Sequence, residues 1–412
     1  MNILWITNII LPEMSAFLGM PENPTGGWLN SSLNKLKSQQ EFNLAVASVY
    51  PGKELISQDI DGVVYYLVPL SGKPIGKYNR SLERKWLQVK SEFNPDIVHV
   101  HGTEFPHGLA WIRACGSDRC VISIQGLVGV ISRYYNIEDE CIPRSFREFI
   151  RRDSIKDIQR KFAKRGEYEK EMISKVSHVI GRTQWDKCHC WAINPNAKYH
   201  FCGETLRNAF YRNKWDFSEC EPFRIFVSNG TSPIKGLHKL LEALPLVLRH
   251  FPDSKVYIAG KDPTSGPWYR RTGYGNYINK LLKKHNLRDK VVFTGFLDGD
   301  EMCEQYLKSN VFVCCSSIEN SPNSLGEAQI LGMPYLTSFV GGAPDIVNSS
   351  SDTIYRYEET EMLAYKICDI FSRGDQAKFP ENDLSRYDAD KNLHDLISIY
   401  HYINDGQLKD EI

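Results

Sequence analysis

The sequence predicts an α/β protein made of two consecutive units, each built around a parallel β-sheet. Short apolar runs alternate with helical patterns along the whole chain, which is typical of parallel strands covered by helices on both faces. The alternation restarts near Phe223, after a polar and irregular stretch at 213–222. We therefore expect an N-terminal domain at 1–212, a linker at 213–222, a C-terminal domain at 223–385 and a final helix at 386–412.

The apolar runs of the first half are bounded by turn residues and have the length of buried strands. They lie at 3–6, 44–49, 63–68, 97–101, 120–124 and 176–180. A loop rich in proline and glycine follows the first run and contains Gly26 and Gly27. Leu29, Leu33 and Leu36 then share one face of a predicted helix.

The second half repeats this organisation. Strands are predicted at 225–227, 256–259, 291–293 and 311–315, and apolar residues at helical spacing predict a helix over 237–248. Leucine, isoleucine and tyrosine recur at helical spacing over 393–403, so the chain is expected to end in an amphipathic helix that packs back toward the first domain. Ligands are expected at the carboxyl ends of the strands.

The amino-acid composition of the chain limits the kinds of partner that it is expected to bind. Lysine plus arginine number 50 and aspartate plus glutamate number 50, so the net charge does not suggest nucleic acid. The 11 cysteines are unpaired in sequence, which favours a reducing compartment, and Cys188-His189-Cys190, the nearest approach to a metal pattern, is more simply explained by neutral thiols. The N-terminus reads as a buried strand rather than a signal peptide, and no apolar run reaches the ~18 residues of a membrane span. The protein is expected to be soluble or at most peripheral.

The stretch 316–345 carries the clearest site. It holds Glu319 and Glu327, eight positions apart, with a polar turn at 320–324 between them. A strand precedes the turn, and a short helix follows it and stops at Gly332 and Pro334. A strand that ends in a turn and opens a helix places backbone N–H groups beside two acids, which suits a ligand carrying both phosphate and hydroxyls.

Four features of the chain resemble glycosyltransferase family 4. They are the E-x7-E pair, Gly341-Gly342-Ala343-Pro344-Asp345 (close to the family's GG-x-PE), Lys235-Gly236 after a strand, and the early Gly26-Gly27. The family comprises retaining, metal-independent sugar transferases with the GT-B fold, in which two Rossmann-like domains face each other across a cleft. The run 181–186 resembles the subgroup that assembles bacterial capsule, exopolysaccharide or O-antigen.

The resemblance implies roles for single residues in the second half. Glu327 would hold the ribose hydroxyls of a nucleotide, and Glu319 would hold hydroxyls of the donor sugar. Lys235 would neutralise the diphosphate without a metal. The amides that would cradle the diphosphate are those of Asn323, Ser324 and Leu325, and the residues that would face the base are Phe296 and Leu297.

The first half would supply the other wall of the site. Gly26 and Gly27 would let a loop approach donor and acceptor closely. Members of the family often have a histidine after a strand of this half, and the matching position in this chain is Gln125. A glutamine side chain cannot act as a general base near neutral pH. His101, at another strand end, is the nearest substitute. A second departure is Gly230, which stands where the family usually has a phosphate-binding arginine.

These departures keep a rival interpretation open, a degenerate nucleotide- or glycan-binding protein on the same fold. A dinucleotide oxidoreductase is disfavoured because no G-x-G-x-x-G follows a strand. Asp298-Gly299-Asp300 mimics the D-x-D of metal-dependent transferases, but a turn and a helix N-cap explain it.

The segment Arg144 to Arg165 contains nine basic and three acidic residues, with phenylalanine and isoleucine interleaved. Such a stretch can dock on an anionic membrane, and it can equally be a pair of solvated helices packed on the sheet.

We therefore expect a metal-independent retaining transferase with no bound cofactor. It would move a sugar from a nucleotide sugar, UDP-linked rather than GDP-linked, to a hydroxyl of a lipid-linked glycan in bacterial surface polysaccharide synthesis. Its expected location is the cytoplasm, peripheral to the membrane, and its candidate catalytic residues are Glu319, Gln125 and His101.

Overall fold

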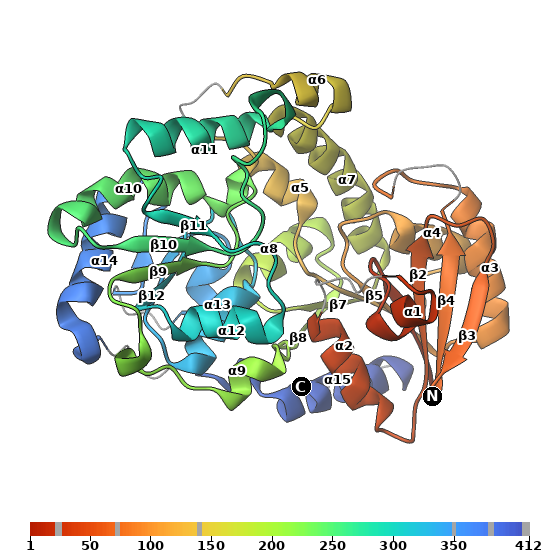
Figure 1. Ribbon diagram of the computed structural model, residues 1–412. Coiled ribbons are helices and arrows are strands. Elements are labelled where there is room, and N and C mark those ends of the chain that lie inside the picture. The colour runs from red at the N-terminus through yellow and green to blue at the C-terminus, as the bar shows by residue number, and fades with distance from the viewer. Residues whose placement is uncertain (21–26, 71–74, 138–141, 348–351, 378–382, 406–412) are drawn as a thin grey trace. The chain divides into compact units, whose positions relative to one another are not determined.

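The computed structural model describes residues 1–412 apart from 21–26, 71–74, 138–141, 348–351, 378–382 and 406–412. The chain forms two compact units, each drawn in Figure 1. The first unit comprises Met1–Ile131, Lys161–Leu206 and Ser385–Ile412, and the second comprises Ser132–Arg160 and Arg207–Leu384.

The first unit contains an eight-stranded sheet in the order β3-β4-β2-β1-β5-β6-β7-β8. Its strands are β1 (Asn2–Thr7), β2 (Asn43–Tyr50), β3 (Ile56–Ile60), β4 (Val63–Pro69), β5 (Ile97–His101), β6 (Cys120–Ser123), β7 (His178–Gly181) and β8 (Lys198–Phe201). All neighbours run parallel except β3, which pairs antiparallel with β4 at one edge. The sheet is therefore mixed at this edge, where the sequence predicted parallel strands only.

Helices lie on both faces of this sheet. Those of the first unit are α1 (Pro12–Phe17), α2 (Gly27–Lys37), α3 (Ser81–Phe93), α4 (His107–Cys115), α5 (Val128–Ile131), α8 (Gln184–Ile193), α15 (Ala389–Asn404), most of α7 (Ile155–Lys175), and the 3-10 turn η7 (Ser385–Tyr387). Residues of α1, α2 and α15 share a core with alternate residues of β1, and residues of α3, α4 and α7 pack on the opposite face.

The C-terminal helix α15 packs against β1 and β5 of the first unit, as predicted. The Tyr400 side chain is fully buried, and its hydroxyl lies 2.9 Å from Trp5 Nε1, which donates to it, and 2.6 Å from His99 Nδ1. These hydrogen bonds join the two ends of the chain within one core.

The second unit contains a parallel six-stranded sheet in the order β11-β10-β9-β12-β13-β14. Its strands are β9 (Arg224–Val227), β10 (Lys255–Ile258), β11 (Val291–Phe293), β12 (Val311–Cys314), β13 (Tyr335–Ser338) and β14 (Ile354–Tyr355). Its helices are α6 (Phe146–Arg151), α9 (Asn208–Arg212), α10 (Leu237–His250), α11 (Gly273–Lys284), α12 (Gly299–Leu307), α13 (Asn323–Leu331) and α14 (Thr360–Arg373). Its 3-10 turns are η1 (Ser132–Tyr134), η2 (Phe217–Glu219), η3 (Pro233–Lys235), η4 (Trp268–Arg270), η5 (Ala343–Asp345) and η6 (Gly374–Gln376).

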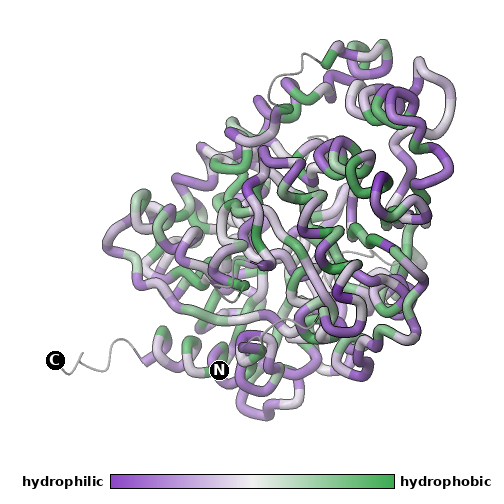
Figure 2. Tube along the Cα trace, turned by 90° about the vertical axis from the view of Figure 1, so that its left-hand side faces the viewer, coloured by the Kyte–Doolittle hydropathy of each residue, from purple (hydrophilic) through white to green (hydrophobic). Residues whose placement is uncertain are grey.

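The core of the second unit divides in the same way. Apolar residues of α10, α11 and α14 pack on one face of the sheet, with alternate residues of β9, β10 and β12. The other face is closed by an aromatic cluster in which Tyr306 of α12 contacts Phe210, Phe226 and Phe312. Figure 2 shows hydrophobic and hydrophilic residues interspersed along the Cα trace.

The units divide the chain differently from the predicted boundaries, because residues 132–160 belong to the second unit. The contacts of the Glu148 side chain explain much of why this segment belongs to the second unit. One of its carboxylate oxygens accepts from the Ser145 amide in a capping box at the start of α6. The other accepts from the Gly273 amide, 2.8 Å away, at the start of α11. A single buried acid thus fastens the segment to α11.

Candidate functional site

The loop between β12 and α13 forms the core of a site in the second unit. β12 ends at Cys314, and α13 begins at Asn323, earlier than the polar turn at 320–324 had suggested. The Leu325 amide donates to the Pro322 carbonyl, 3.0 Å away. The amides of Asn323 and Ser324 donate to no acceptor within the described chain, so the positive end of α13 presents two N–H groups for an anion.

Glu319 lies in this loop and is held through both its side chain and its backbone. Lys235 Nζ donates to Glu319 Oε1 over 2.5 Å, and Ser316 Oγ donates to the same oxygen over 2.6 Å. The Gly342 amide donates to the Glu319 carbonyl over 2.9 Å. A Cβ at Gly341, where φ is +53°, would stand 1.9 Å from that carbonyl oxygen. The paired glycines are therefore needed for the backbone of the loop to approach so closely.

Lys235 reaches Glu319 from the end of η3. Burial would lower the pKa of Lys235, but the adjacent Glu319 carboxylate raises it overall, so the ammonium group is charged. Gly236 follows with φ at +67°, and a Cβ there would stand 1.7 Å from the Cys315 carbonyl oxygen. The Lys-Gly pair thus places a cation against the loop that bears Glu319.

Gly236→Ala is expected to lower the free energy of unfolding by about 3 kcal/mol or more, since it adds a steric clash to the left-handed backbone. Gly266 is the matched control, because its φ is +74° but nothing lies within 4 Å of an added Cβ. Gly266→Ala should cost only about 1 kcal/mol. Denaturant titrations of both variants measure the difference, and equal losses would show that the close approach at Gly236 is unimportant.

Glu327 is buried on α13 and bound by a residue that the sequence analysis missed. Arg207 Nε and Nη2 donate to the two carboxylate oxygens, each over 2.7 Å. Tyr306 Oη donates to the Ser324 carbonyl over 2.9 Å and lies 3.5 Å from Glu327 Oε2. Burial raises the pKa of Glu327, and the hydrogen bonds from Arg207 and Tyr306 oppose this. A carboxylate has about four acceptor sites, so two N–H donors leave capacity for hydroxyls.

The remaining predicted residues of this unit follow β9 and β11, and of these two strands only β9 is a neighbour of β12. Phe296 follows β11 and is 79% exposed, and Leu297 is half-buried. Gly230, which stands in place of the family's arginine, packs against the core. A Cβ there would come within 2.8 Å of Leu237 Cδ2 and 2.9 Å of Ile258 Cγ2. This position therefore has no room for a larger side chain in the observed backbone.

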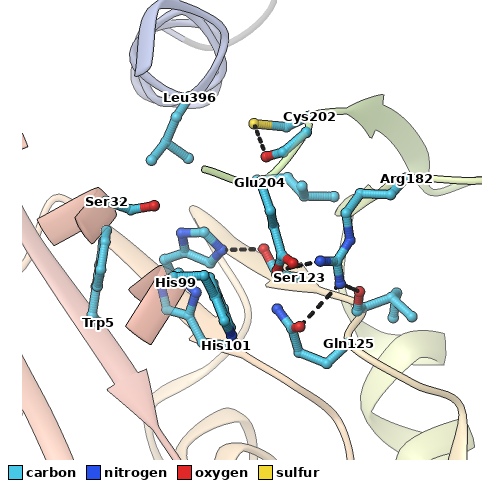
Figure 3. Close-up of a pocket in the computed structure, with 14 residues that line it drawn as sticks. Trp5, Ser32, His99, His101, Ser123, Gln125, Arg182, Cys202, Glu204 and Leu396 are labelled. Carbon is cyan, nitrogen blue, oxygen red and sulfur yellow. Dashed lines mark hydrogen bonds and ion pairs between the residues drawn. The ribbon is translucent and has the colours of Figure 1, made fainter. Parts of the chain in front are cut away.

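A second cluster lies in the first unit, at the carboxyl ends of four neighbouring strands. His101 ends β5, Gln125 follows β6, Arg182 follows β7 and Glu204 follows β8. They line a cavity of about 40 Å³ together with Trp28 and other residues, and Figure 3 shows their side chains. Parallel strands bring their carboxyl ends to one sheet edge, so the position of Arg182 soon after the apolar run 176–180 was the signal that could have found it. Glu204 had no such signal, because the strand before it, Lys-Tyr-His-Phe, is not an apolar run.

His101 is buried in this cavity, and neither of its ring nitrogens has a hydrogen-bond partner among the described residues. Its ring stacks on His99, with centroids 3.7 Å apart. Burial lowers the pKa of His99 to about 3. Burial, and then the positive charges of His99 and Arg182, hold the pKa of His101 well below its ordinary value. Both imidazoles are neutral at physiological pH, so His101 can accept or donate a hydrogen bond without carrying charge.

Arg182 connects the other members of the cluster. It forms a buried ion pair with Glu204 and donates to the Ile124 carbonyl over 2.7 Å and to Gln125 Oε1 over 3.0 Å. Its guanidinium does not pair with Asp186, which lies one helical turn further on. The Asp186 carboxylate instead accepts from the Arg182 backbone amide over 3.0 Å.

Of the predicted glycines, Gly26 lies outside the described residues, and Gly27 is the first residue of α2. The structure brings Glu319 and Lys235 into contact in the second unit, in a loop that leads to Asn323 and Ser324 at the start of α13, and it places His101 and Gln125 in one cavity of the first unit. That the two clusters complete one site stays a prediction.

Two buried acids lie near the loop that carries Gln125. Glu169 of α7 accepts from Thr103 Oγ1 over 2.7 Å and from the amides of Val128 and Gly129 over 3.1 and 2.9 Å. Glu104 is half-buried as a residue, but its Oε2 is buried and unpartnered among the described residues. Burial raises the pKa of both carboxyls to about 7. The loop is thus held by acids that titrate near neutrality.

Glu104→Gln is expected to change the pH dependence of stability. A carboxyl whose folded pKa is raised stabilises the fold fully below its unfolded pKa of about 4.3, and this contribution is lost as the pH rises through 7. Between pH 4 and pH 8, the free energy of unfolding of the variant should therefore rise by on the order of 3 kcal/mol relative to that of the unchanged protein. Urea midpoints at both pH values measure this, and parallel pH profiles would contradict it. Glu92→Gln, on the exposed surface of α3, is the control.

Two other patterns have structural explanations. Asp298 is the N-cap of α12 and forms a capping box with Glu301, which confirms the turn and cap expected for Asp298-Gly299-Asp300. Over the described part of the chain, no group of three or more His, Cys, Asp or Glu side chains could hold a metal ion, and Cys188 is exposed while Cys190 is buried. In the same residues no helix is long and apolar enough to span a membrane.

The comparison with protein families concerns the unit that holds Glu319 and Glu327. Residues 208–382 match the family described as Glycosyl transferases group 1. The matched stretch lies within the second unit. Spore coat protein SA of Bacillus subtilis (strain 168) is 28% identical over 182 residues, which are 41% of this chain and 46% of that protein. The chain spans less than half the length of this relative and of the next two curated relatives that it matches.

Solved structures extend the similarity to the whole fold. Anabaena Alr3699/HepE, solved in complex with UDP-glucose, has a TM-score of 0.65 at 14% identity, with 97% of this chain and 99% of that chain covered. Sucrose-phosphate synthase from Thermosynechococcus elongatus has a TM-score of 0.64 at 14% identity, with 98% and 96% covered. The chain has the two-domain GT-B fold, as predicted.

Proposed function

We propose that this protein is a retaining glycosyltransferase of family 4 that takes its sugar from a UDP-sugar. The observation that carries the proposal is the charged pair of Lys235 and Glu319, with Glu319 in the loop that leads into the two open amides at the start of α13. A lysine and a helix N-terminus together bind a diphosphate, while the carboxylate can accept hydroxyls of a sugar. This is the combination of groups that a nucleotide sugar presents.

The nucleotide would lie along the same loop. Glu327, oriented by its two hydrogen bonds from Arg207, would accept the ribose hydroxyls. The exposed ring of Phe296 offers an apolar face to the base. UDP is favoured over GDP because Alr3699/HepE, which has the same fold, was solved with UDP-glucose.

The reaction would need no metal at this site. When the bond between the sugar C1 and the diphosphate oxygen breaks, negative charge develops on the β-phosphate. The Lys235 ammonium and the amides of Asn323 and Ser324 would stabilise that charge. The acceptor oxygen would form a new bond to C1 on the same face, and its proton would pass to the departing diphosphate. Glu319 would hold the sugar hydroxyls during this step.

The acceptor would be a hydroxyl of a lipid-linked glycan, and the first unit would bind it. His101 and Gln125 are neutral hydrogen-bonding groups in the cavity of that unit, which suits recognition of a hydroxyl rather than proton abstraction. The proposed setting is bacterial surface polysaccharide synthesis, with the protein in the cytoplasm and peripheral to the membrane.

Glu319→Ala tests the proposal. With the UDP-sugar that the unchanged protein uses, found by measuring UDP release from a panel of nucleotide sugars, the variant should lose about 100-fold or more in kcat. Its affinity for UDP should change little, because Glu319 would contact the sugar. The control is Glu358→Ala, because Glu358 is an exposed acid just before α14. A fall in UDP affinity with normal turnover would contradict this role.

A binding protein that has lost catalysis is the alternative, favoured by the absence of an arginine at Gly230 and of a histidine at Gln125. It would bind UDP or a glycan as the proposed enzyme does. It would release no UDP from any nucleotide sugar, with or without an acceptor, and this result distinguishes the two.

A further inference from the structure

The second unit exposes an unusual number of large apolar side chains in one place. Phe146, Phe149 and Ile150 of α6 are 64%, 69% and 65% exposed. Trp268, in the turn η4, is 69% exposed, and its neighbour Tyr269 is 46% exposed. The helix α6 contacts η4, although the two are more than a hundred residues apart in sequence, and α6 stands at the outer end of α11 in Figure 1. Two distant segments thus contribute to one apolar surface.

Basic residues surround this apolar surface. Residues 143–160 contain six basic side chains against three acidic ones. The three acids are already engaged. Glu148 accepts from two backbone amides, Asp153 pairs with Arg147 over 2.9 Å, and Asp157 pairs with Arg144 over 2.9 Å. The exposed cations around the surface are Arg151, Arg152, Lys156 and Arg270.

A cavity of about 430 Å³ opens between α6, η4 and α11. Aromatic rings from Phe146, Trp268 and Tyr277 line it, together with the polar or charged side chains of Asn276 and Lys280. Its volume is in the range that takes a small polar group such as a phospholipid headgroup. Exposed rings beside such a cavity are the amphipathic side chains found where a protein enters a membrane interface.

We propose that this surface, which we call the docking face, binds a bilayer containing anionic phospholipid. The docking face comprises Phe146, Phe149, Ile150, Trp268 and Tyr269 with Arg151, Arg152, Lys156 and Arg270. Its apolar side chains enter the boundary between headgroups and acyl chains, and its cations contact headgroup phosphates, one of which occupies the cavity. A bilayer fits better than a protein partner because the exposed charges of the docking face are all basic. The proposal deepens the proposed function. The purpose of membrane binding would be to reach a lipid-linked acceptor, and this purpose rests on the proposed function.

Sedimentation of the full chain with vesicles tests the proposal. Binding is expected to vesicles of phosphatidylcholine with 40% phosphatidylglycerol, to weaken steeply as salt is raised, and to be near zero with pure phosphatidylcholine. Phe149→Ser with Trp268→Ser, and separately Arg151→Glu with Arg152→Glu, should each lower the partition constant about tenfold or more. The matched control combines Tyr365→Ser and Arg356→Glu on another part of the second unit, where these side chains are 68% and 74% exposed.

Three outcomes would overturn the proposal. The first is equal binding to neutral and anionic vesicles, and the second is binding that survives both pairs of substitutions. The third is a dimer, seen in sedimentation equilibrium, that the same substitutions dissociate. In that case a second copy of the chain would be the occupant of the docking face. Lys235→Ala should leave vesicle binding unchanged while it weakens UDP binding. If the docking face is wrong, vesicle binding is lost while UDP binding remains. If the proposed function is wrong, UDP binding is lost while vesicle binding remains, so the two failures can be told apart.

Discussion

Replacing Lys235 with alanine is expected to lower kcat/KM for the UDP-sugar by about 100- to 1000-fold. The substitution removes the cation that lies 2.5 Å from Glu319, in the loop that precedes α13. The charge that develops on the leaving diphosphate would then meet only the two amides, because Gly230 supplies no second cation. Since Glu319 also loses its partner, both kcat and the affinity for UDP should fall.

Lys308→Ala is the matched control for this variant. Lys308 forms a lysine–glutamate pair at 2.5 Å with Glu304, at the end of α12, but neither residue lies at the proposed donor site. Steady-state kinetics of UDP release should be unchanged by it. Lys235→Ala with kinetics like those of the control would remove the lysine from the mechanism.

Glu327→Ala is expected to lower the free energy of unfolding by about 3 kcal/mol. The reason is that Arg207, whose guanidinium donates to both oxygens of Glu327, would keep a largely buried charge without a partner. UDP affinity should fall as well, because the ribose would lose its acceptor. Denaturant titration and UDP calorimetry measure the two effects separately.

Combining Glu327→Ala with Arg207→Met separates the two roles. The double variant contains no orphaned charge, so its stability should recover part of the loss, since an apolar replacement of a buried pair costs less than breaking it. Its UDP affinity should stay as low as that of Glu327→Ala alone. Recovery of UDP affinity in the double variant would show that Glu327 holds the domain together and does not bind ribose.

Most of the strands that the sequence predicted are buried, although β11 is a partly exposed edge strand and the buried strand β13 was not predicted. A buried parallel strand is a near-continuous apolar run, so residues 97–101 and 311–315 could be recognised directly. β3 was missed because Ile-Ser-Gln-Asp-Ile alternates and lies at an edge. The start of α13 was placed too late because asparagine and serine beside a proline are typical of a turn, yet here Pro322 is the N-cap residue and the helix begins directly after it.

The site residues that the sequence missed depend on contacts between distant segments. Arg207 pairs with Glu327 across 120 positions, and no local pattern marks it. Residues 132–160 were placed in the N-terminal domain because they lie within its span of sequence, and contacts between distant segments, such as that of Glu148 with Gly273, show that they belong to the second unit. The motifs around Glu319 were predictable because the loop needs particular glycines at Gly236 and Gly341 to form.

The most direct test of the account is a calorimetric titration of the protein with UDP. The account predicts saturable binding at one site per chain, weakened about tenfold or more by Lys235→Ala and by Glu327→Gln, and unchanged by Lys308→Ala. Absence of UDP binding to the unchanged protein, or binding that both site variants leave intact, would contradict the claim that the loop between β12 and α13 holds a nucleotide sugar.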